Sequence, residues 1–212
     1  MNNLYSYRQE YSMNELIESK AKKSPFDQFK TWFNDAEASA INLPNAMILA
    51  TTDNSLMAST RFVLLKVFDR KGFTFFTNYN SKKAQQIADN PQGSLLFPWN
   101  EIERQVRIEG KIEKVSEEES DEYFDTRPEG SRIGAWASPQ SQVIPSREYL
   151  EKIDGDFRKN FETDYIPRPD HWGGYRLIPN LFEFWQGREN RLHDRLEYYL
   201  DGKEWKMRRL AP

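Results

Sequence analysis

The sequence predicts a mainly β protein with helices, an α+β fold in which helices decorate an antiparallel barrel. Six or more segments have the apolar or alternating pattern of strands, and most are joined by short turns. Segments with helical spacing of apolar residues lie between these strands. Aromatic residues make up 14% of the 212 residues, which is enough to build the core of one domain.

Helices are indicated by capping residues, such as Ser116 three residues before Glu119. We expect helices over residues 25–40, 81–89, 117–127 and 147–161. Ser12 and Glu15 form a further capping box, which predicts a short helix near the start of the chain.

Strands are expected where apolar runs end in turn residues. We expect them over residues 46–52, 57–68, 73–77, 94–99, 105–115, 175–178 and 181–186. Residues 128–146 are rich in Gly, Ser and Pro and are expected to form a loop. Asp201-Gly202 predicts the tight turn of a final hairpin, in a register that pairs Tyr198 with Trp205 and Glu197 with Lys206.

The composition excludes several classes of site and partner. The chain has no Cys, which excludes disulfides, thiolate metal sites and a Cys nucleophile. A formal net charge of −3 argues against nucleic acid as a partner. No run approaches the ~20 apolar residues of a membrane span, and no signal peptide pattern is present, so we expect a cytoplasmic protein. Neither Rossmann nor P-loop motifs occur, and the two His residues lack the spacing of metal ligands.

Two groups of basic residues in the first half of the chain have unusual positions. Lys82 and Lys83 fall in the first turn of a predicted helix, where the helix dipole disfavours cations unless an anion is bound. A solvated pair of lysines is an equally good interpretation. Arg61 and Lys66 flank the apolar run 62–65, which has the pattern of a strand buried on both faces. Their spacing places them on opposite faces of one flat strand, and both could instead reach water.

Two further groups lie in the second half. Arg191, His193 and Arg195 alternate, so that in an extended segment all three point the same way. We favour an anionic ligand there over pairing with acidic neighbours such as Glu183. Tyr123, Arg127 and Ser131 could grip a phosphate, or could form the end of an ordinary amphipathic helix. Separate local anion sites fit one or two phosphorylated, planar ligands better than a polyanion.

Several segments, in order along the chain, resemble the pyridoxamine 5′-phosphate oxidase family. The most specific is Phe182–Arg195, with the sequence FEFWQGRENRLHDR. The others are residues 61–66, 76–78, 81–84, 95–99, 103–106, 133–136 and 209–212. Phe76, Arg188 and Asn190 depart from residues common in that family, and the Arg-Leu-His-Asp-Arg core is intact.

The resemblance implies a split β-barrel homodimer that binds FMN at the subunit interface. It implies a flexible N-terminal lid over residues 1–23 and one FMN-binding domain over residues 24–212. The residues implied to hold FMN are Arg61, Phe62, Val63, Leu64, Leu65, Lys66, Phe76, Thr77, Lys82, Lys83, Gln105, Gln140, Ser141, Trp185 and Arg195.

The resemblance also implies an oxidase of pyridoxamine 5′-phosphate or pyridoxine 5′-phosphate that forms pyridoxal 5′-phosphate. O2 would accept the electrons and give hydrogen peroxide, and the amine substrate would release ammonia. The substrate would be bound by Arg8, Tyr11, Lys66, Tyr123, Arg127, Ser131, Arg191 and His193. Arg191 and His193 are the implied catalytic residues.

Two other functions are compatible with the same residues. A carrier that stores FMN or pyridoxal phosphate would be yellow and would make no peroxide from pyridoxamine phosphate. A barrel that binds single-stranded nucleic acid through stacked aromatics would show salt-dependent oligonucleotide binding, which the acidic charge balance disfavours.

Overall fold

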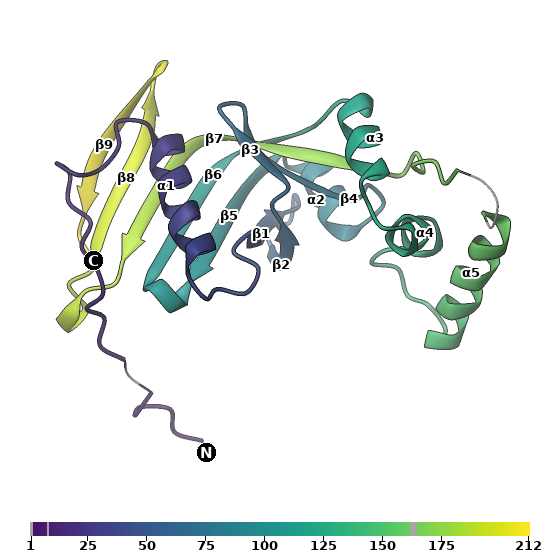
Figure 1. Ribbon diagram of the computed structural model, residues 1–212, viewed down its shortest axis with the longest axis horizontal. Helices are drawn as coiled ribbons and strands as arrows, with labels where there is room; N and C mark the ends of the chain where they lie inside the picture. Colours follow the sequence, from purple (N-terminus) through teal and green to yellow (C-terminus); the bar gives the residue numbers. More distant parts are fainter. Residues whose placement is uncertain (1, 8, 162–164) are drawn as a thin grey trace. The chain divides into compact units, whose positions relative to one another are not determined.

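The computed structural model describes residues 2–7, 9–161 and 165–212. The chain forms an α+β structure (Figure 1), which confirms the predicted split-barrel class. Hydrogen bonding links the strands in the order β2-β1-β5-β6-β7-β4-β3, and β8 pairs with both β7 and β9. The strands are β1 Ala46–Thr52, β2 Ala58–Leu64, β3 Val67–Asp69, β4 Gly72–Asn78, β5 Gln92–Trp99, β6 Arg104–Lys114, β7 Trp172–Gln186, β8 Asp194–Asp201 and β9 Glu204–Leu210. No helix in the described part of the chain is long and apolar enough to span a membrane.

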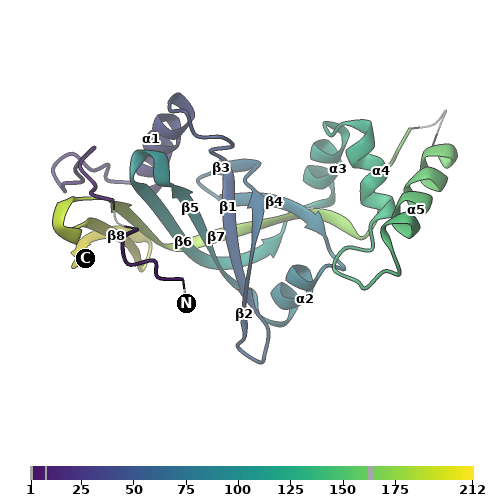
Figure 2. The same ribbon diagram turned by 90° about the horizontal axis from the view of Figure 1, so that it is seen from below.

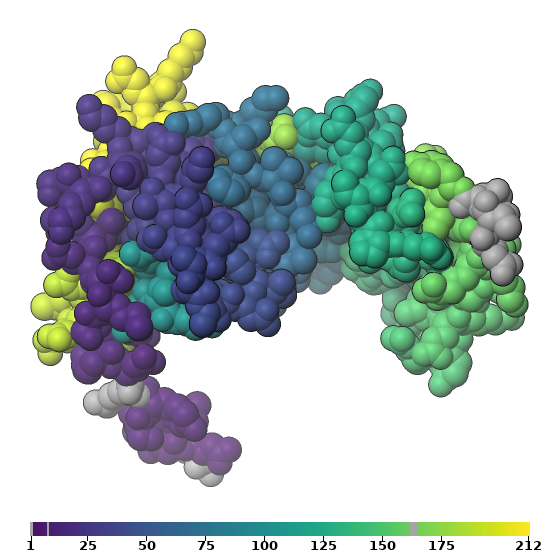
Figure 3. Space-filling view, viewed as in Figure 1, coloured from purple at the N-terminus to yellow at the C-terminus, as the bar shows by residue number. Residues whose placement is uncertain are grey.

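The chain divides into two compact units. The first unit contains residues 1–49, 94–110 and 179–212. Its core forms where helix α1 (Pro25–Ala38) lays its apolar face on the sheet. Phe29 meets Phe97 at 5.0 Å between ring centroids, and Trp32 meets Phe184 edge-on at 5.2 Å. Figures 1 and 3 show the segment that leads into α1 lying beside the C-terminal strands of this unit, whereas the N-terminus itself points away from them.

The second unit contains residues 50–93 and 111–178. Its helices are α2 (Lys82–Asp89), α3 (Glu117–Asp125), α4 (Glu129–Ala137) and α5 (Arg147–Asn160). Helices α4 and α5 lie side by side (Figure 2). Phe124 of α3 and Ile133 of α4 pack with Trp172 in a buried cluster. This cluster fixes the ends of α3 and α4 that line the site described below.

The four predicted helices are confirmed at α1, α2, α3 and α5, but the side chains of Ser24 and Ser81 make no capping hydrogen bond to α1 and α2. The Ser116 hydroxyl accepts a hydrogen bond from the Glu119 N–H, and the Ser146 hydroxyl accepts one from the Tyr149 N–H. The loop prediction for residues 128–146 is wrong over the range of α4. Burial of Ile133 and Ala135 against α3 outweighs the low helix propensity of the Gly residues in this segment.

Three other predictions of local structure are wrong. The strand over 57–68 is two strands, because the chain breaks at Leu65-Lys66, where the Lys66 N–H bonds to the Thr74 carbonyl. Residues 175–186 form the single strand β7, which continues through Pro179. No helix follows Ser12, because the Met13 and Leu16 N–H groups donate to carboxylates far along the chain instead of to a helix.

The final hairpin is confirmed, but its register differs by two residues. Tyr198 pairs with Met207, and Glu197 pairs with Arg208, whose Nε donates to the Glu197 carboxylate at 2.6 Å. A shift of two residues leaves every side chain on its expected face. The alternating pattern therefore predicted correctly which side chains share a face of the hairpin. The turn residues Asp201-Gly202 did not predict which residues pair across it.

Candidate active site

A cavity of about 620 Å³ opens in the second unit between the β2 and β4 strands and the facing ends of α3 and α4. It brings together many of the residues predicted from the sequence: Phe62, Val63, Leu64, Lys66, Phe76, Thr77, Lys83, Tyr123, Arg127, Ser131 and Gln140. Sequence reasoning missed Thr126, Pro128 and Trp172, which also line it. Trp172 follows a Pro-rich connector, and nothing in its local pattern marks it as part of a site.

Lys83 forms the cationic end of this cavity. Its Nζ donates to Gln140 Oε1 at 2.7 Å, to Thr77 Oγ1 at 3.1 Å and to Ser81 Oγ at 3.3 Å, all of them neutral acceptors. Burial, and then the nearby charge of Arg61, lower the Lys83 pKa to about 8. Among the described residues no carboxylate forms an ion pair with Lys83, so an anionic ligand would complete its surroundings.

Arg61 supports this end from β2. Its guanidinium donates to Thr51 Oγ1 at 2.6 Å and to Gln86 Oε1 at 3.2 Å, and burial lowers its pKa. Lys82, the other lysine of the first helical turn, is exposed. Lys83 is therefore half-buried and Lys82 is solvated, and their predicted contacts with an anion stay predictions.

The apolar pattern of residues 62–65 predicted a strand buried on both faces, and this prediction is wrong. The Phe62 side chain is 70% exposed and Leu64 is 37% exposed, whereas Leu65 is buried in the core. Leu65 is therefore a core residue, and its predicted contact with FMN stays a prediction. The break after β2 also removes the difficulty that Arg61 and Lys66 would point to opposite faces of one strand.

An aromatic stack and a guanidinium form another part of the same cavity. The Phe76 ring stacks on Tyr123 at 4.0 Å and on Trp172 at 5.6 Å. The Arg127 guanidinium lies 4.4 Å from the Trp172 ring centroid, and burial lowers its pKa. Arg127 Nη1 is buried and has no hydrogen-bond partner among the residues that the structure describes, a state that costs stability unless a ligand supplies an acceptor.

Two more groups stand beside Arg127. Lys66 Nζ lies 5.7 Å from the Tyr123 ring centroid, and Ser131 lies in the first turn of α4. Cationic, hydroxyl and guanidinium donors thus line this part of the cavity, as the phosphate-grip interpretation of Tyr123, Arg127 and Ser131 expects.

A second cluster lies in the first unit, around His193. Its ring is 4.6 Å from Trp185, and Tyr11 meets both rings edge-on, each at 5.7 Å. Arg191 lines the same cavity of about 530 Å³ as His193 and Tyr11. Arg8, the remaining residue predicted in this region, lies outside the described residues.

The hydrogen bonding of His193 fixes its tautomer. His193 Nδ1 accepts a hydrogen bond from the Arg188 backbone N–H at 3.1 Å, so the proton of the neutral ring sits on Nε2. Burial, and then the charge of Arg191, lower the His193 pKa below its ordinary value. The neutral ring with an Nε2 proton is therefore the form this environment favours.

The prediction that Arg191, His193 and Arg195 share one extended face is wrong. Arg191 belongs to a short 3-10 turn over Glu189–Arg191 and has a left-handed φ of 61°. Only Arg195 lies in β8, where its Nε donates to the buried Glu183 carboxylate at 2.8 Å. The acidic alternative weighed for Arg195 is thus the contact that the structure has.

The remaining predicted residues have diverse positions. Gln105 is half-buried in β6, and Ser141 is exposed with a φ of 71° directly after Gln140. Neither lines the cavity of the second unit. Their predicted contacts with FMN stay predictions.

Comparison with known proteins identifies the family. The sequence pattern described as pyridoxamine 5′-phosphate oxidase matches residues 33–153, and that of the pyridoxine 5′-phosphate oxidase C-terminal dimerisation region matches residues 172–212. The chain belongs to the pyridoxamine 5′-phosphate oxidase family. It is therefore an oxidoreductase, and the match to the dimerisation region supports a homodimer.

Similar proteins cover the whole chain. The pyridoxine/pyridoxamine 5′-phosphate oxidase of Bordetella avium is 57% identical over 97% of both chains, and that of Nostoc punctiforme is 56% identical over 97% of this chain and 96% of its own. The crystal structure of PhzG from Burkholderia lata, in complex with tetrahydrophenazine-1-carboxylic acid, has a TM-score of 0.89 and 30% identity over 95% of this chain and 100% of its own. An FMN-binding protein from Nostoc punctiforme shares the fold at a TM-score of 0.71 and 16% identity, over 89% of this chain and 98% of its own.

Proposed function

We propose that this enzyme is an FMN-dependent oxidase that converts pyridoxamine 5′-phosphate or pyridoxine 5′-phosphate to pyridoxal 5′-phosphate in vitamin B6 metabolism. The observation that carries the proposal is one cavity lined by two cations without an anionic partner among the described residues. In that part of the chain, Lys83 has only neutral hydrogen-bond acceptors, and Arg127 Nη1 has no acceptor. Two phosphate esters, one at each cation, would supply the anionic hydrogen-bond acceptors that Lys83 and Arg127 lack. The names of the close relatives support the same substrates.

The residues of the second unit fit the phosphate of FMN. Lys83 and Arg61 would supply charge, while Thr77 and Gln140 hold the Lys83 ammonium in place. The full set proposed to hold FMN is the one given by the family resemblance. Bound FMN would supply the redox chemistry by accepting two electrons from the substrate and passing them to O2, with hydrogen peroxide as the product.

The chain itself would bind and orient the substrate. Arg127, Lys66, Tyr123 and Ser131 would hold the 5′-phosphate, with the Arg127 guanidinium already fixed on the Trp172 ring. Because that guanidinium is held before the substrate arrives, little conformational entropy is lost on binding.

His193 and Arg191 would act on the substrate ring. The Arg188 N–H keeps the His193 proton on Nε2, from which the ring can donate a hydrogen bond to a substrate oxygen or nitrogen. Arg191 favours the neutral state of His193 through its charge and would offer a guanidinium to the substrate. Tyr11 packs on His193 and, with Arg8, would cover the bound substrate.

We also propose that FMN lies at the interface of the homodimer. The exposed Phe62 and Leu64 side chains on β2, next to Arg61, are apolar groups that a second copy would cover. A shared site of this kind would let the C-terminal dimerisation region of one copy contribute Trp185 and Arg195 to the cavity of the other.

The test is to supply the purified protein with pyridoxamine 5′-phosphate or pyridoxine 5′-phosphate in air. We expect pyridoxal 5′-phosphate and hydrogen peroxide in equal amounts, with ammonia from the amine alone. A yellow protein that forms neither product would instead be a carrier of FMN. A colourless protein that stays inactive after FMN is added would contradict the proposal.

A further inference from the structure

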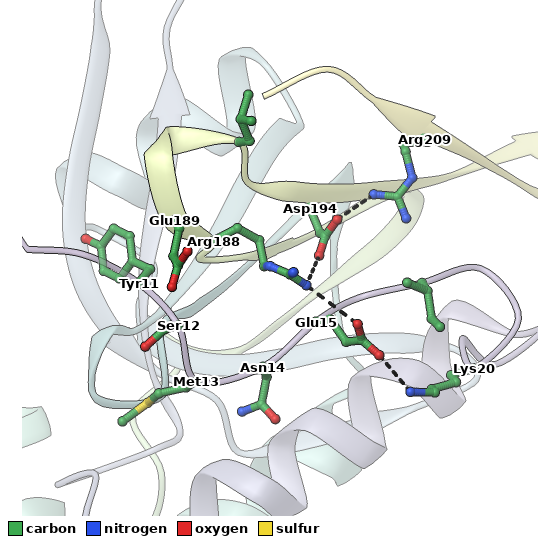
Figure 4. Close-up of a pocket in the computed structure, with 12 residues that line it drawn as sticks. Tyr11, Ser12, Met13, Asn14, Glu15, Lys20, Arg188, Glu189, Asp194 and Arg209 are labelled. Atoms are coloured by element: carbon green, nitrogen blue, oxygen red, sulfur yellow. Dashed lines mark hydrogen bonds and ion pairs between the residues drawn. The ribbon is translucent and has the colours of Figure 1, made fainter.

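The N-terminal strap, residues Tyr11–Leu16, has no regular structure, but its backbone is attached at two points in the first unit and its Glu15 carboxylate lies 3.8 Å from Arg188 Nη1. The Met13 N–H donates to Glu103 Oε2 at 2.9 Å. The Leu16 N–H donates to Asp194 Oδ2 at 3.1 Å, and the Leu16 carbonyl accepts from Arg209 Nη2 at 2.8 Å. Figure 4 shows the strap passing Asp194 and its two ion-pair partners, Arg188 and Arg209.

Glu103 is unusual among the carboxylates of this unit. It is only 5% exposed and has a left-handed φ of 56°. Within the described residues no cation pairs with its carboxylate, and the Met13 N–H is the donor it receives. Burial of a carboxylate without a neighbouring cation destabilises the folded protein. The packing of the fold does not by itself explain why Glu103 occupies this position.

Hydrogen bonds that do not involve the strap hold the backbone at Glu103 in place. The Glu103 carbonyl accepts from the Gly187 N–H at 2.7 Å and from Gln186 Nε2 at 3.1 Å. Gln186 is fully buried and receives a hydrogen bond from Arg104 Nε at 2.9 Å. The Glu103 carboxylate is therefore presented to the strap by a rigid support.

Gly187 connects this support to Tyr11. A Cβ at Gly187 would lie 2.7 Å from Tyr11 Cβ and Cγ and 3.1 Å from Glu103 Cβ. The absence of a side chain at Gly187 therefore lets Tyr11 lie close to the backbone that joins Trp185 to His193. Tyr11 reaches both rings from that position.

We infer that Glu103 is a positioning residue, which holds the Met13 N–H so that Tyr11 packs on His193 and Trp185. The inference rests on the proposed function in its claim that Tyr11 covers the substrate. The Leu16 end of the strap has its own attachment at Asp194 and Arg209, so loss of the Glu103 carboxylate loosens the Tyr11 end, where the Asn190 N–H still donates to Glu10 Oε2 at 3.3 Å. Glu103 touches neither substrate nor cofactor in this account and acts only through Tyr11.

The experiment compares Glu103→Ala with Glu103→Gln in the full-length enzyme. Glu103→Gln keeps an oxygen that can accept from Met13, so we expect it to behave within about twofold of the unaltered enzyme. Glu103→Ala removes the acceptor, so we expect KM for the phosphorylated substrate to rise by about tenfold or more, with FMN affinity unchanged. Tyr11→Ala should give the same KM, and the double variant should add no further loss.

A second readout does not depend on activity. The chain has two His residues, so NMR of the ring Cε1 protons gives two signals, one from His193 and one from His171 in the other unit. Glu103→Ala and Tyr11→Ala should move the His193 signal to the same new position, because both remove the Tyr11 ring from it. The His171 signal should stay in place, and Glu103→Gln should move neither.

The inference is overturned if the His193 signal of Glu103→Ala stays where it is in the unaltered protein, or if the KM effects of Glu103→Ala and Tyr11→Ala multiply. Should Glu103→Ala fail to fold, Glu103→Asp keeps the carboxylate but draws it back from the Met13 N–H by one carbon–carbon bond, and it is read in the same way. An enzyme that oxidises neither substrate would refute the proposed function alone, because the NMR readout still decides the role of Glu103.

Discussion

Removal of the Lys83 ammonium gives the most quantitative prediction for FMN binding. Lys83→Met deletes an ammonium group that Gln140, Thr77 and Ser81 hold at 2.7–3.3 Å, and leaves Arg61 as the nearby cation. A hydrogen bond to a charged group contributes about 1.5–3 kcal/mol, so the Kd for FMN should rise roughly 10–150-fold. Titration of the apoprotein into FMN, followed by quenching of flavin fluorescence, measures this Kd.

The pH dependence sharpens the same prediction. Since the Lys83 pKa is about 8 without ligand, half of the ammonium groups are already neutral at that pH. A bound phosphate favours the charged form, so binding takes up a proton above pH 8, and affinity should fall by up to about tenfold per pH unit there. Lys83→Met should lack this fall.

The matched control is Lys71→Met, which removes the same charge from an exposed turn of the same unit. We expect its Kd for FMN to stay within about twofold of the unaltered protein, since exposed charges contribute little. Equal FMN affinity in Lys83→Met and Lys71→Met would refute the assignment of Lys83 to the phosphate.

Four further predictions address substrate binding, the catalytic role of His193, its protonation and the fold. Arg127→Ala should raise KM for the phosphorylated substrates roughly tenfold or more while FMN affinity stays constant, because its unpartnered Nη1 is assigned to the 5′-phosphate; steady-state kinetics with a parallel FMN titration would contradict this if both constants rose together. His193→Ala should lower kcat with FMN still bound, and unaltered kcat/KM would remove the residue from the catalytic role. Because burial and the Arg191 charge hold the His193 pKa low, kcat/KM of the unaltered enzyme should fall only below the ordinary His pKa, and Arg191→Ala should move that acid limb to higher pH; a pH–rate profile tests the direction. Gly72→Ala should destabilise the fold by roughly 2–4 kcal/mol in urea unfolding, because the position has a φ of 141° and a Cβ there would clash with the Leu177 carbonyl oxygen; an unchanged midpoint would show that the turn adapts.

Local signals in the sequence were sufficient for elements whose ends are set locally. Ser116 and Ser146 cap α3 and α5 as expected, since a capping hydroxyl needs only its neighbours in sequence. Helix α4 escaped prediction because tertiary burial of Ile133 stabilises it despite Gly130 and Gly134. The break after β2 escaped for a similar reason, because the Thr74 carbonyl that receives the Lys66 N–H comes from another strand.

The sequence was sufficient to predict which charged residues belong to the candidate site, but not how these residues are arranged in space. The position of Lys83 in a first helical turn suggested an anion site, and the structure makes Lys83 rather than Lys82 the half-buried member. The extended face proposed for Arg191 fails because Asn190 and Arg191 adopt positive φ, which an alternating pattern does not reveal. Trp172 and Glu103 gave no local signal, because their roles depend on contacts distant in sequence.

The central claim, that the chain oxidises a vitamin B6 phosphate through bound FMN, is tested most directly by the absorbance spectrum of the purified protein without oxygen. Addition of pyridoxamine 5′-phosphate should bleach the flavin band, and admission of air should restore it with release of pyridoxal 5′-phosphate. A flavin band that persists unchanged at saturating substrate, in protein shown to hold FMN, would contradict the account.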